Sequence, residues 1–558
     1  MMLQSSIAQN ENDLVPGTVH LVDIRGNLKV KKDAEGKNII LQPQPSSNVN
    51  DPLRWPQSKK IKQFSLAFLL AVSVNFSGPL WVPWSESFNC SFFQLNVSSA
   101  LCFLFLGIGC LFLQPTALKL GRRFVYLVCT VIILISNIIG SQATNVKYLY
   151  VVNILGGFAA APVDSLVEIS STDVFFQHER STVFSLLILA LYAGSDLGPV
   201  ACGYIVEKLS WRWCYYIQII IYGVLLIIQI FYMEDTTFRR EYNAESLEAE
   251  ILAQIKSNKT PEEKYSGRKE KDSKVEVRVS SIEAIDDISS NDTSSINSSI
   301  PKRTYWQRIK FIELEYNDTR SWLTIFYRPF LLISFPAIIW GGVLYGAQMM
   351  WLSLLATTQS EIYSASPYFF SVPQVGLTNL GACVGSLLGM VYGGTFVDYL
   401  ALRLAKRNNG ILEPEFRLWA MFVPTFFNAG GLLAYGLGSY LEAHWAVSVV
   451  VGQGLLGFAM SSSGAICLTY AVDSYPKVAS EGLVLMLFCR NCIGMAFTFA
   501  IQPWLDRNGL SITTWLMFML SLIINGSFLL MIKWGKDFRR WTAARYDKYS
   551  DPRYGQIF

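Results

Sequence analysis

The chain is poor in charged residues and contains only three histidines. Of its 558 residues 16% are charged, compared with roughly a quarter in an average soluble domain, whereas 51% are apolar. The net charge of +4 is too small and too dispersed to indicate nucleic acid as a partner. The sequence also has no GxxxxGK[ST] loop to hold nucleotide phosphates. These absences argue against a soluble protein and a nucleotide hydrolase, and nothing supports an enzyme.

Cysteine and histidine do not form a recognisable metal-binding pattern. The ten cysteines lack His-partnered zinc spacing, and most lie within apolar stretches. We interpret them as small apolar core residues, and we expect no cofactor and no metal.

Long apolar stretches are the main positive feature. A membrane-spanning helix needs roughly 20 mostly apolar residues. Six such stretches precede a polar segment and six follow it, at approximately 63–83, 98–117, 124–142, 148–171, 182–206, 214–233, 329–357, 372–397, 418–440, 445–472, 480–503 and 511–533. The pattern predicts an all-α integral membrane protein with twelve transmembrane helices in two six-helix bundles.

The same pattern divides the chain into five parts. We predict an N-terminal tail over 1–56, a first bundle over 57–234, a hydrophilic linker over 235–327, a second bundle over 328–535 and a C-terminal tail over 536–558. Within the linker, the stretch 245–257 predicts a short surface helix.

Basic residues gather on alternate loops. They cluster at 54–62, 119–123, 239–240, 302–310, 403–417 and 533–540. The positive-inside rule therefore predicts that both termini and the linker face the cytoplasm. The sequence has no cleavable signal peptide, so the first span is expected to direct membrane insertion. The sequons at Asn89 and Asn96 would then lie on the first exterior loop.

Loop motifs identify a family. They are Gly121–Arg123 after the second span, Gly194–Pro199 and Cys202–Gly203 in the fifth, Trp211–Trp213, Gly394–Asp398 after the eighth, and Glu413–Arg417. Together, over roughly 52–540, they resemble the major facilitator superfamily, and specifically the fungal branch of twelve-span drug:proton antiporters. Further matches at Asn50–Trp55, Ser171–His178 and Asn408–Leu418 resemble members that take up histidinol, other organic cations and polyamines.

The motifs have physical interpretations. Gly121 allows a tight turn, and Arg122, Arg123 and Asp398 can bond across the two bundles to close a cytoplasmic gate. Alternatively, the two arginines serve only as positive-inside anchors.

Small residues in the fifth span predict close packing at the bundle interface. Gly194, Gly198 and Gly203 allow close helix approach, and Pro199 locally frees backbone groups.

The sequence also departs from the antiporter pattern. Leu118 stands where the family usually has an acid, and Asn153 and Gly156 replace the Arg and Gln of the fourth span. Since the family associates that Arg with proton exchange, these departures count against antiport.

Acidic residues within spans are candidates for a substrate site, since charge at bilayer depth is costly and usually functional. Asp164 and Glu168 share one face of the fourth span, Asp196 lies in the fifth and Arg490 in the eleventh. Glu168 could instead be solvated, and Asp196 could pair with Arg490 or stay protonated. We expect Asp164 to lack a basic partner, so that its removal leaves membrane insertion intact.

Polar and aromatic side chains complete the predicted site. Tyr345 and Gln348 are three residues apart in the seventh span and share a face, and Asn75 lies in the first span. An aromatic face with carboxylates suits an ammonium group. Trp340 and Trp351 could equally be interfacial belt residues.

These features favour a plasma-membrane transporter that takes up an organic cation, such as a polyamine or a histidinol-like amine, by alternating access. The alternative is a proton-coupled multidrug exporter. The expected partners are the cationic substrate, the lipid bilayer and, if transport is proton-coupled, protons. We expect a monomer.

Overall fold

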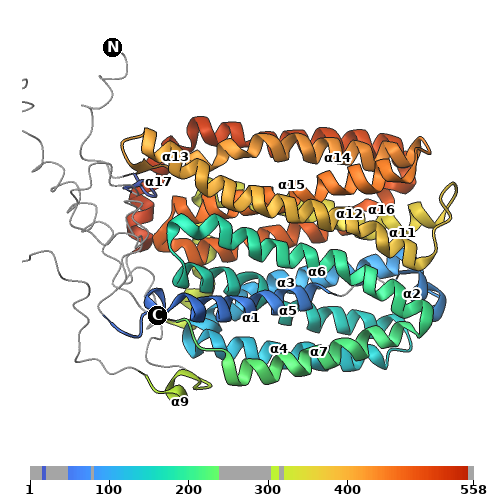
Figure 1. Ribbon diagram of the computed structural model, residues 1–558, viewed down its shortest axis with the longest axis horizontal. Helices are drawn as coiled ribbons and strands as arrows, with labels where there is room; N and C mark the ends of the chain where they lie inside the picture. Colours follow the sequence, from blue (N-terminus) through green and yellow to red (C-terminus); the bar gives the residue numbers. More distant parts are fainter. Residues whose placement is uncertain (1–14, 21–47, 77–80, 238–302, 313–319, 551–558) are drawn as a thin grey trace, which may run out of the picture.

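The computed structural model describes residues 15–20, 48–76, 81–237, 303–312 and 320–550 as two groups of nearly parallel helices (Figure 1). The first half contains α1 (Gln57–Asn75), α2 (Trp81–Phe88), α3 (Phe92–Leu120), α4 (Arg122–Ser141), α5 (Val146–Val174), α6 (Arg180–Lys208) and α7 (Trp211–Tyr232), with 3-10 turns η1 (Pro52–Arg54) and η2 (Gln177–Glu179). Two short helices follow, α9 (Tyr305–Arg308) and α10 (Trp322–Leu331), with the turn η4 (Leu332–Ser334).

The second half is built in the same way. It contains α11 (Pro336–Ser364), α12 (Val372–Val391), η5 (Tyr392–Phe396), α13 (Val397–Arg407), η6 (Pro414–Met421), α14 (Phe422–Tyr440), η7 (Val447–Gln453), α15 (Gly454–Ser474), η8 (Pro476–Val478), α16 (Ala479–Gly526) and α17 (Phe528–Ser550). We call the end of the molecule with α9, α13 and α17, at the left of Figure 1, the linker end. The opposite end, with α2, is the far end.

Apolar helices of spanning length dominate the structure. Among the described residues, ten helical stretches are long and apolar enough to cross a membrane. The last of them, Pro476–Ser550, covers two predicted spans, which a non-helical Gly509 (φ 73°, ψ 166°) divides. The first predicted span corresponds to α1 and α2. Each of the twelve predicted stretches thus overlaps a helix, and the all-α membrane fold is confirmed.

The two halves meet through corresponding helices. The second predicted span, α3, packs against the eleventh in α16, and the fifth span, α6, packs against the eighth, α12. If the second six spans repeat the first six, the second span corresponds to the eighth and the fifth to the eleventh. A two-fold rotation about an axis along the helix direction then converts the contact between the second and eleventh spans into the contact between the eighth and fifth.

The helices extend beyond two predicted boundaries. α10 begins at Trp322, inside the predicted linker, and α17 continues to Ser550, past the predicted bundle end at 535. In this extension the Arg545 guanidinium lies 4.4 Å from the Trp541 ring centroid. Such cation–π contacts suit a helix that lies at the membrane–water interface. A hydropathy count does not detect such a helix, because it is not a membrane span. The helix predicted over 245–257 lies outside the described residues.

A segment of the predicted N-terminal tail docks on the second half. The strand β1 (Val19–His20) pairs antiparallel with β2 (Ile411–Leu412). Arg539 of α17 donates hydrogen bonds to the Pro16 carbonyl oxygen and to Thr18 Oγ1, at 2.5 and 3.1 Å. The sequence had indicated only a polar tail here, because two-residue strands leave no periodic signal.

Candidate functional site

A cavity of about 430 Å³ lies between the two halves. Asp164 and Arg490 line its base, near the middle of the helices. Trp84, Tyr215 and Ser364 line it toward the far end. A cavity of this size between two helical bundles is typical of a small-molecule site.

An ion pair joins the two halves at the base of the cavity. Arg490 of α16 donates from Nη2 to Oδ2 of Asp164 on α5, and both side chains are buried. Its guanidinium also lies 4.8 Å from the Tyr345 ring centroid. The expectation that Asp164 lacks a basic partner is therefore wrong, because a helix of the other half supplies one. The alternative, in which Asp196 pairs with Arg490, is also wrong for this conformation.

The other two acids are buried in different surroundings. Asp196 on α6 lines the main cavity and is 3% exposed. Glu168, 4% exposed, instead lines a separate cavity of about 20 Å³. Within the described part of the chain, Asp196 Oδ2 and Glu168 Oε2 have no hydrogen-bond partner. Asp164 and Glu168 thus lie near the single guanidinium of Arg490, whereas Asp196 faces the main cavity separately.

Asn75 and Tyr345, two further predicted substrate residues, lie in different surroundings. Asn75 lines the cavity and donates from Nδ2 to the Ala71 carbonyl oxygen at 3.0 Å. Tyr345 is buried beneath Arg490.

Gln348 is a correction to the predicted site. Its amide donates to Asn525 Oδ1 at 3.0 Å and accepts from Asn428 Nδ2 at 3.1 Å, within the core of the second half. These bonds explain the polarity of this buried side chain without a substrate, because a buried amide requires partners.

The cavity also contains polar side chains that the sequence analysis did not select. They include Ser98, Asn137, Asn153, Gln218, Thr357, Gln359 and Asn379. Asn153, noted above only as a departure from the antiporter pattern, donates to Ser98 Oγ at 2.8 Å. The sequence signal for these residues was a polar side chain inside an apolar run. Such residues occur in several spans, and hydropathy does not show which of them face the cavity.

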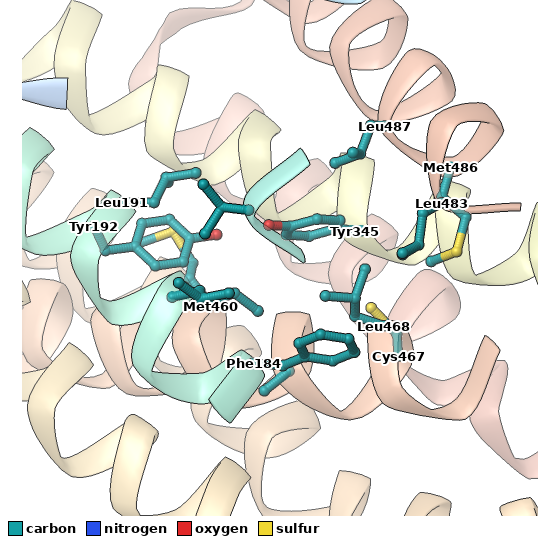
Figure 2. Close-up of a cluster of buried hydrophobic side chains, with 14 of the residues drawn as sticks. Phe184, Leu191, Tyr192, Tyr345, Met460, Cys467, Leu468, Leu483, Met486 and Leu487 are labelled. Carbon is teal, nitrogen blue, oxygen red and sulfur yellow. The ribbon is translucent and has the colours of Figure 1, made fainter. Parts of the chain in front are cut away.

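An apolar layer separates the cavity from the linker end. Figure 2 shows Leu191 and Tyr192 of α6, Tyr345 of α11, and Met460 and Leu468 of α15 packed together, with the two tyrosine hydroxyl groups turned toward each other. All five side chains are buried. Because α6 belongs to the first half and the other two helices to the second, the layer closes the interface between halves.

A network of charges closes the linker end below this layer. Arg417 donates to Asp398 at 2.6 Å and to Asp473 at 3.0 Å, all within the second half. From the first half, Arg180 bonds to Asp473 at 2.5 Å. The Thr182 backbone N–H and hydroxyl donate to Asp398 Oδ2, at 3.0 and 2.9 Å. Asp398 therefore contacts both halves, and the sequence analysis had not placed Arg180 or Asp473 in the gate.

The two predicted gate arginines behave differently. Arg122 pairs with Asp173 of the first half at 2.5 Å. Arg123 donates to the carbonyl oxygens of Ile230 at 2.6 Å and Lys310 at 2.8 Å. The prediction that they bond across the two halves is wrong for this conformation. The turn itself is present at Gly121, where φ is 92° and ψ is 151°.

Small residues of α6 lie at close helix contacts. A Cβ atom on Gly194 would lie 2.5 Å from the Val72 carbonyl oxygen of α1. A Cβ atom on Gly376 of α12 would lie 2.6 Å from the Pro199 carbonyl oxygen, across the two halves. Gly198 is buried, and Gly203 also faces α12.

Comparisons with known proteins agree on one family. Residues 64–499 match the model of the Major Facilitator Superfamily. An uncharacterized MFS-type transporter of Schizosaccharomyces pombe, C1271.10c, is 32% identical over 94% of this chain and 91% of that protein. The Saccharomyces cerevisiae protein HOL1 is 29% identical over 96% of this chain and 97% of its own length.

Solved structures share the fold at low sequence identity. The proton:xylose symporter XylE superposes with a TM-score of 0.57 and 12% identity, over 86% of this chain and 97% of XylE. The human organic anion transporter MFSD10 gives a TM-score of 0.52 and 15% identity, over 85% of this chain and 100% of that one.

Proposed function

The chain belongs to the major facilitator superfamily, and we propose that it takes up organic cations across the plasma membrane by alternating access. The substrates are polyamines or histidinol-like amines. The proposal includes an orientation with both termini and the linker in the cytoplasm, so that the far end faces outside. The resemblance of the loop motifs to fungal transporters of organic cations supports the same substrate class.

The buried carboxyl group of Asp196, which faces the cavity, carries this proposal. Arg490 is engaged by Asp164, and Asp196 faces the same cavity with Oδ2 lacking a partner among the described residues. A substrate ammonium group can supply the missing donor. The aromatic rings of Trp84, Tyr215 and Tyr222 line the same cavity and offer faces that attract cations.

Alternating access fits the way the interface is closed. The cavity extends from Asp164 toward the far end, whereas the ion pair of Arg180 and the hydrogen bonds of Thr182 hold the linker end closed. To release a substrate at the linker end, these bonds must break while contacts at the far end form. The membrane potential would favour uptake by about 2.3 kcal/mol per positive charge per 100 mV.

Spermidine uptake tests the function. Radiolabelled spermidine should accumulate in cells that lack their own polyamine carriers when they express this protein. Asp196→Asn should raise the half-saturating concentration roughly ten- to a hundred-fold, because a charged hydrogen bond contributes about 1.5–3 kcal/mol. Glu207→Gln, at an exposed carboxylate of the same helix, is the matched control and should behave as wild type. Uptake equal to that of cells with empty vector would refute the proposal.

Toxic cations test the direction of transport. An importer should sensitise cells to methylglyoxal bis(guanylhydrazone), because the compound would enter through the same cavity. Resistance to this compound and to several unrelated drugs would instead identify the proton-coupled exporter.

A further inference from the structure

Glu168 occupies a small cavity of its own behind the ion pair. It lies four residues, or about 6 Å of helix rise, from Asp164 toward the linker end. Its cavity of about 20 Å³ is lined by Asn75, Asp164, Leu187, Ile188 and Tyr345 among others, and is large enough for about one water molecule. No organic cation fits this space, so Glu168 needs a different ligand from Asp196.

The surroundings of Glu168 contain little that could balance a negative charge. Charged and titratable groups face it from its own helix and from four neighbouring helices. They are Asp164 on α5, Arg490 on α16, Tyr345 on α11, Cys110 on α3 and Cys467 on α15. The single cation of this set already bonds to Asp164. An ionised carboxylate without donors is strongly unfavourable at such burial, whereas a protonated carboxyl is tolerated.

We propose that Glu168 is the proton-binding site of this transporter and that each proton bound there enters with the organic cation. The inference rests on the function proposed above and adds its coupling ion. A proton from water in the main cavity forms an O–H bond with a Glu168 carboxylate oxygen and leaves to water at the linker end, without electron transfer. Asn75 and Asp164 line both cavities and so form the polar boundary that the proton crosses.

Arg490 links the proton to the movement of the two halves. Its Nη1 is buried and has no hydrogen-bond partner in the described part of the chain, although Nη2 bonds to Asp164. With a proton on Glu168, the guanidinium stays with Asp164, as in this structure. After the proton leaves, the Glu168 carboxylate attracts the guanidinium one turn along α5.

That shift moves the second half against the first. Because α16 belongs to the second half and α5 to the first, the exchange of partners accompanies a sliding of the halves. It also gives the Glu168 carboxylate a cationic partner while the empty carrier returns.

Glu168→Gln separates proton coupling from substrate binding, since the amide imitates the protonated acid. In proteoliposomes with full-length protein, the variant should retain exchange of labelled for unlabelled spermidine. It should lose accumulation driven by an imposed pH gradient and lose the dependence of uptake on external pH. Glu168→Asp, which retains a carboxyl group, should recover part of both, and Glu207→Gln should match wild type.

The outcomes separate this inference from the proposed function. If Glu168→Gln accumulates spermidine with the wild-type dependence on pH, or loses exchange together with accumulation, Glu168 is not the proton site. Wild-type protein that neither accumulates nor exchanges spermidine would refute the proposed function itself.

A measurement on wild type covers the case in which the variant does not fold. Adding spermidine to wild-type proteoliposomes should make a weakly buffered outer medium more alkaline as protons enter. Spermidine uptake without any pH change would overturn the inference and leave the function standing.

Discussion

Asp164 and Arg490 form an ion pair with 8% and 1% of their side chains exposed. Charges at this depth interact strongly, and each has given up its hydration to form the pair. Removing one partner therefore leaves the other as an uncompensated buried charge, at a cost of about 3–5 kcal/mol. Removing both avoids that cost, so the pair must be tested as a unit.

We predict that Asp164→Asn lowers the stability and the surface level of the protein, and that adding Arg490→Gln restores both. The thermal unfolding midpoint in detergent measures stability, and surface biotinylation measures delivery to the membrane. Glu207→Gln serves as the control for loss of an exposed carboxylate. If Asp164→Asn alone is as stable as wild type, Arg490 has found another partner. Glu168 would be the first candidate for that partner.

The two sequons differ in exposure. Asn89 is exposed between α2 and α3, whereas Asn96 lies inside α3 with 3% of its surface accessible. If the far end faces the exterior, the glycan should attach to Asn89 alone. Asn89→Gln should then abolish the shift in gel mobility on deglycosylation, and Asn96→Gln should leave it unchanged. A shift that is lost with Asn96→Gln would contradict the placement of this residue.

Sequence reasoning at the residue scale found the acids but not their partners. The cost of charge in a membrane singles out Asp164, Glu168 and Asp196 wherever they point. Which of them meets Arg490 depends on how far α16 is rotated and shifted against α5, and no local pattern records that. For the same reason Gln348 was assigned to the substrate, although α14 and α16 supply Asn428 and Asn525 as its partners.

At the scale of elements, the contacts between α6 and the second half hold the linker end closed. Arg180, near the start of α6, joins the two halves through Asp473. We predict that Arg180→Gln favours opening of the linker end, because Asp473 keeps its bond to Arg417 and no charge is orphaned. A cysteine placed at the buried position Ser185 should then react faster with a membrane-permeant maleimide.

The matched control for this gate experiment is Arg212→Gln. Arg212 lies in the first turn of α7 at the far end and donates to the Ala143 carbonyl oxygen. Its loss should leave labelling at Ser185→Cys unchanged. If Arg180→Gln gives the same labelling rate as the unsubstituted background, the network does not control opening.

Helices were easier to predict than the segments between them. A span is specified by its own composition, and each predicted stretch overlaps a helix. The strand Val19–His20 and the part of α17 that extends past the predicted bundle end at 535 have no such local signal. Both are fixed by contacts with distant residues, such as the bidentate bonds from Arg539 to Glu415 at 2.9 and 2.6 Å.

At the scale of the whole molecule, the two-fold arrangement follows from the repeat of six spans. Two related contacts, α3 with α16 and α6 with α12, lie on either side of the cavity. Movement of one half against the other can therefore open either end of the same cavity, as alternating access requires. The loop motifs indicated the family from the sequence, but the conformation closed at the linker end could be seen only in the structure.

The orientation of this molecule in the membrane is the last prediction. Basic residues crowd the linker end, including Lys533, Lys536 and Arg540 of α17, and positive charge marks the cytoplasmic side. Epitope tags inserted at residue 270 and at the C-terminus should therefore be hidden from antibodies on intact cells and accessible after permeabilisation. A tag inserted after Gln142, between α4 and α5 at the far end, is the matched control and should be labelled on intact cells. Labelling of either of the first two tags on intact cells would reverse the orientation, and with it the proposed direction of uptake.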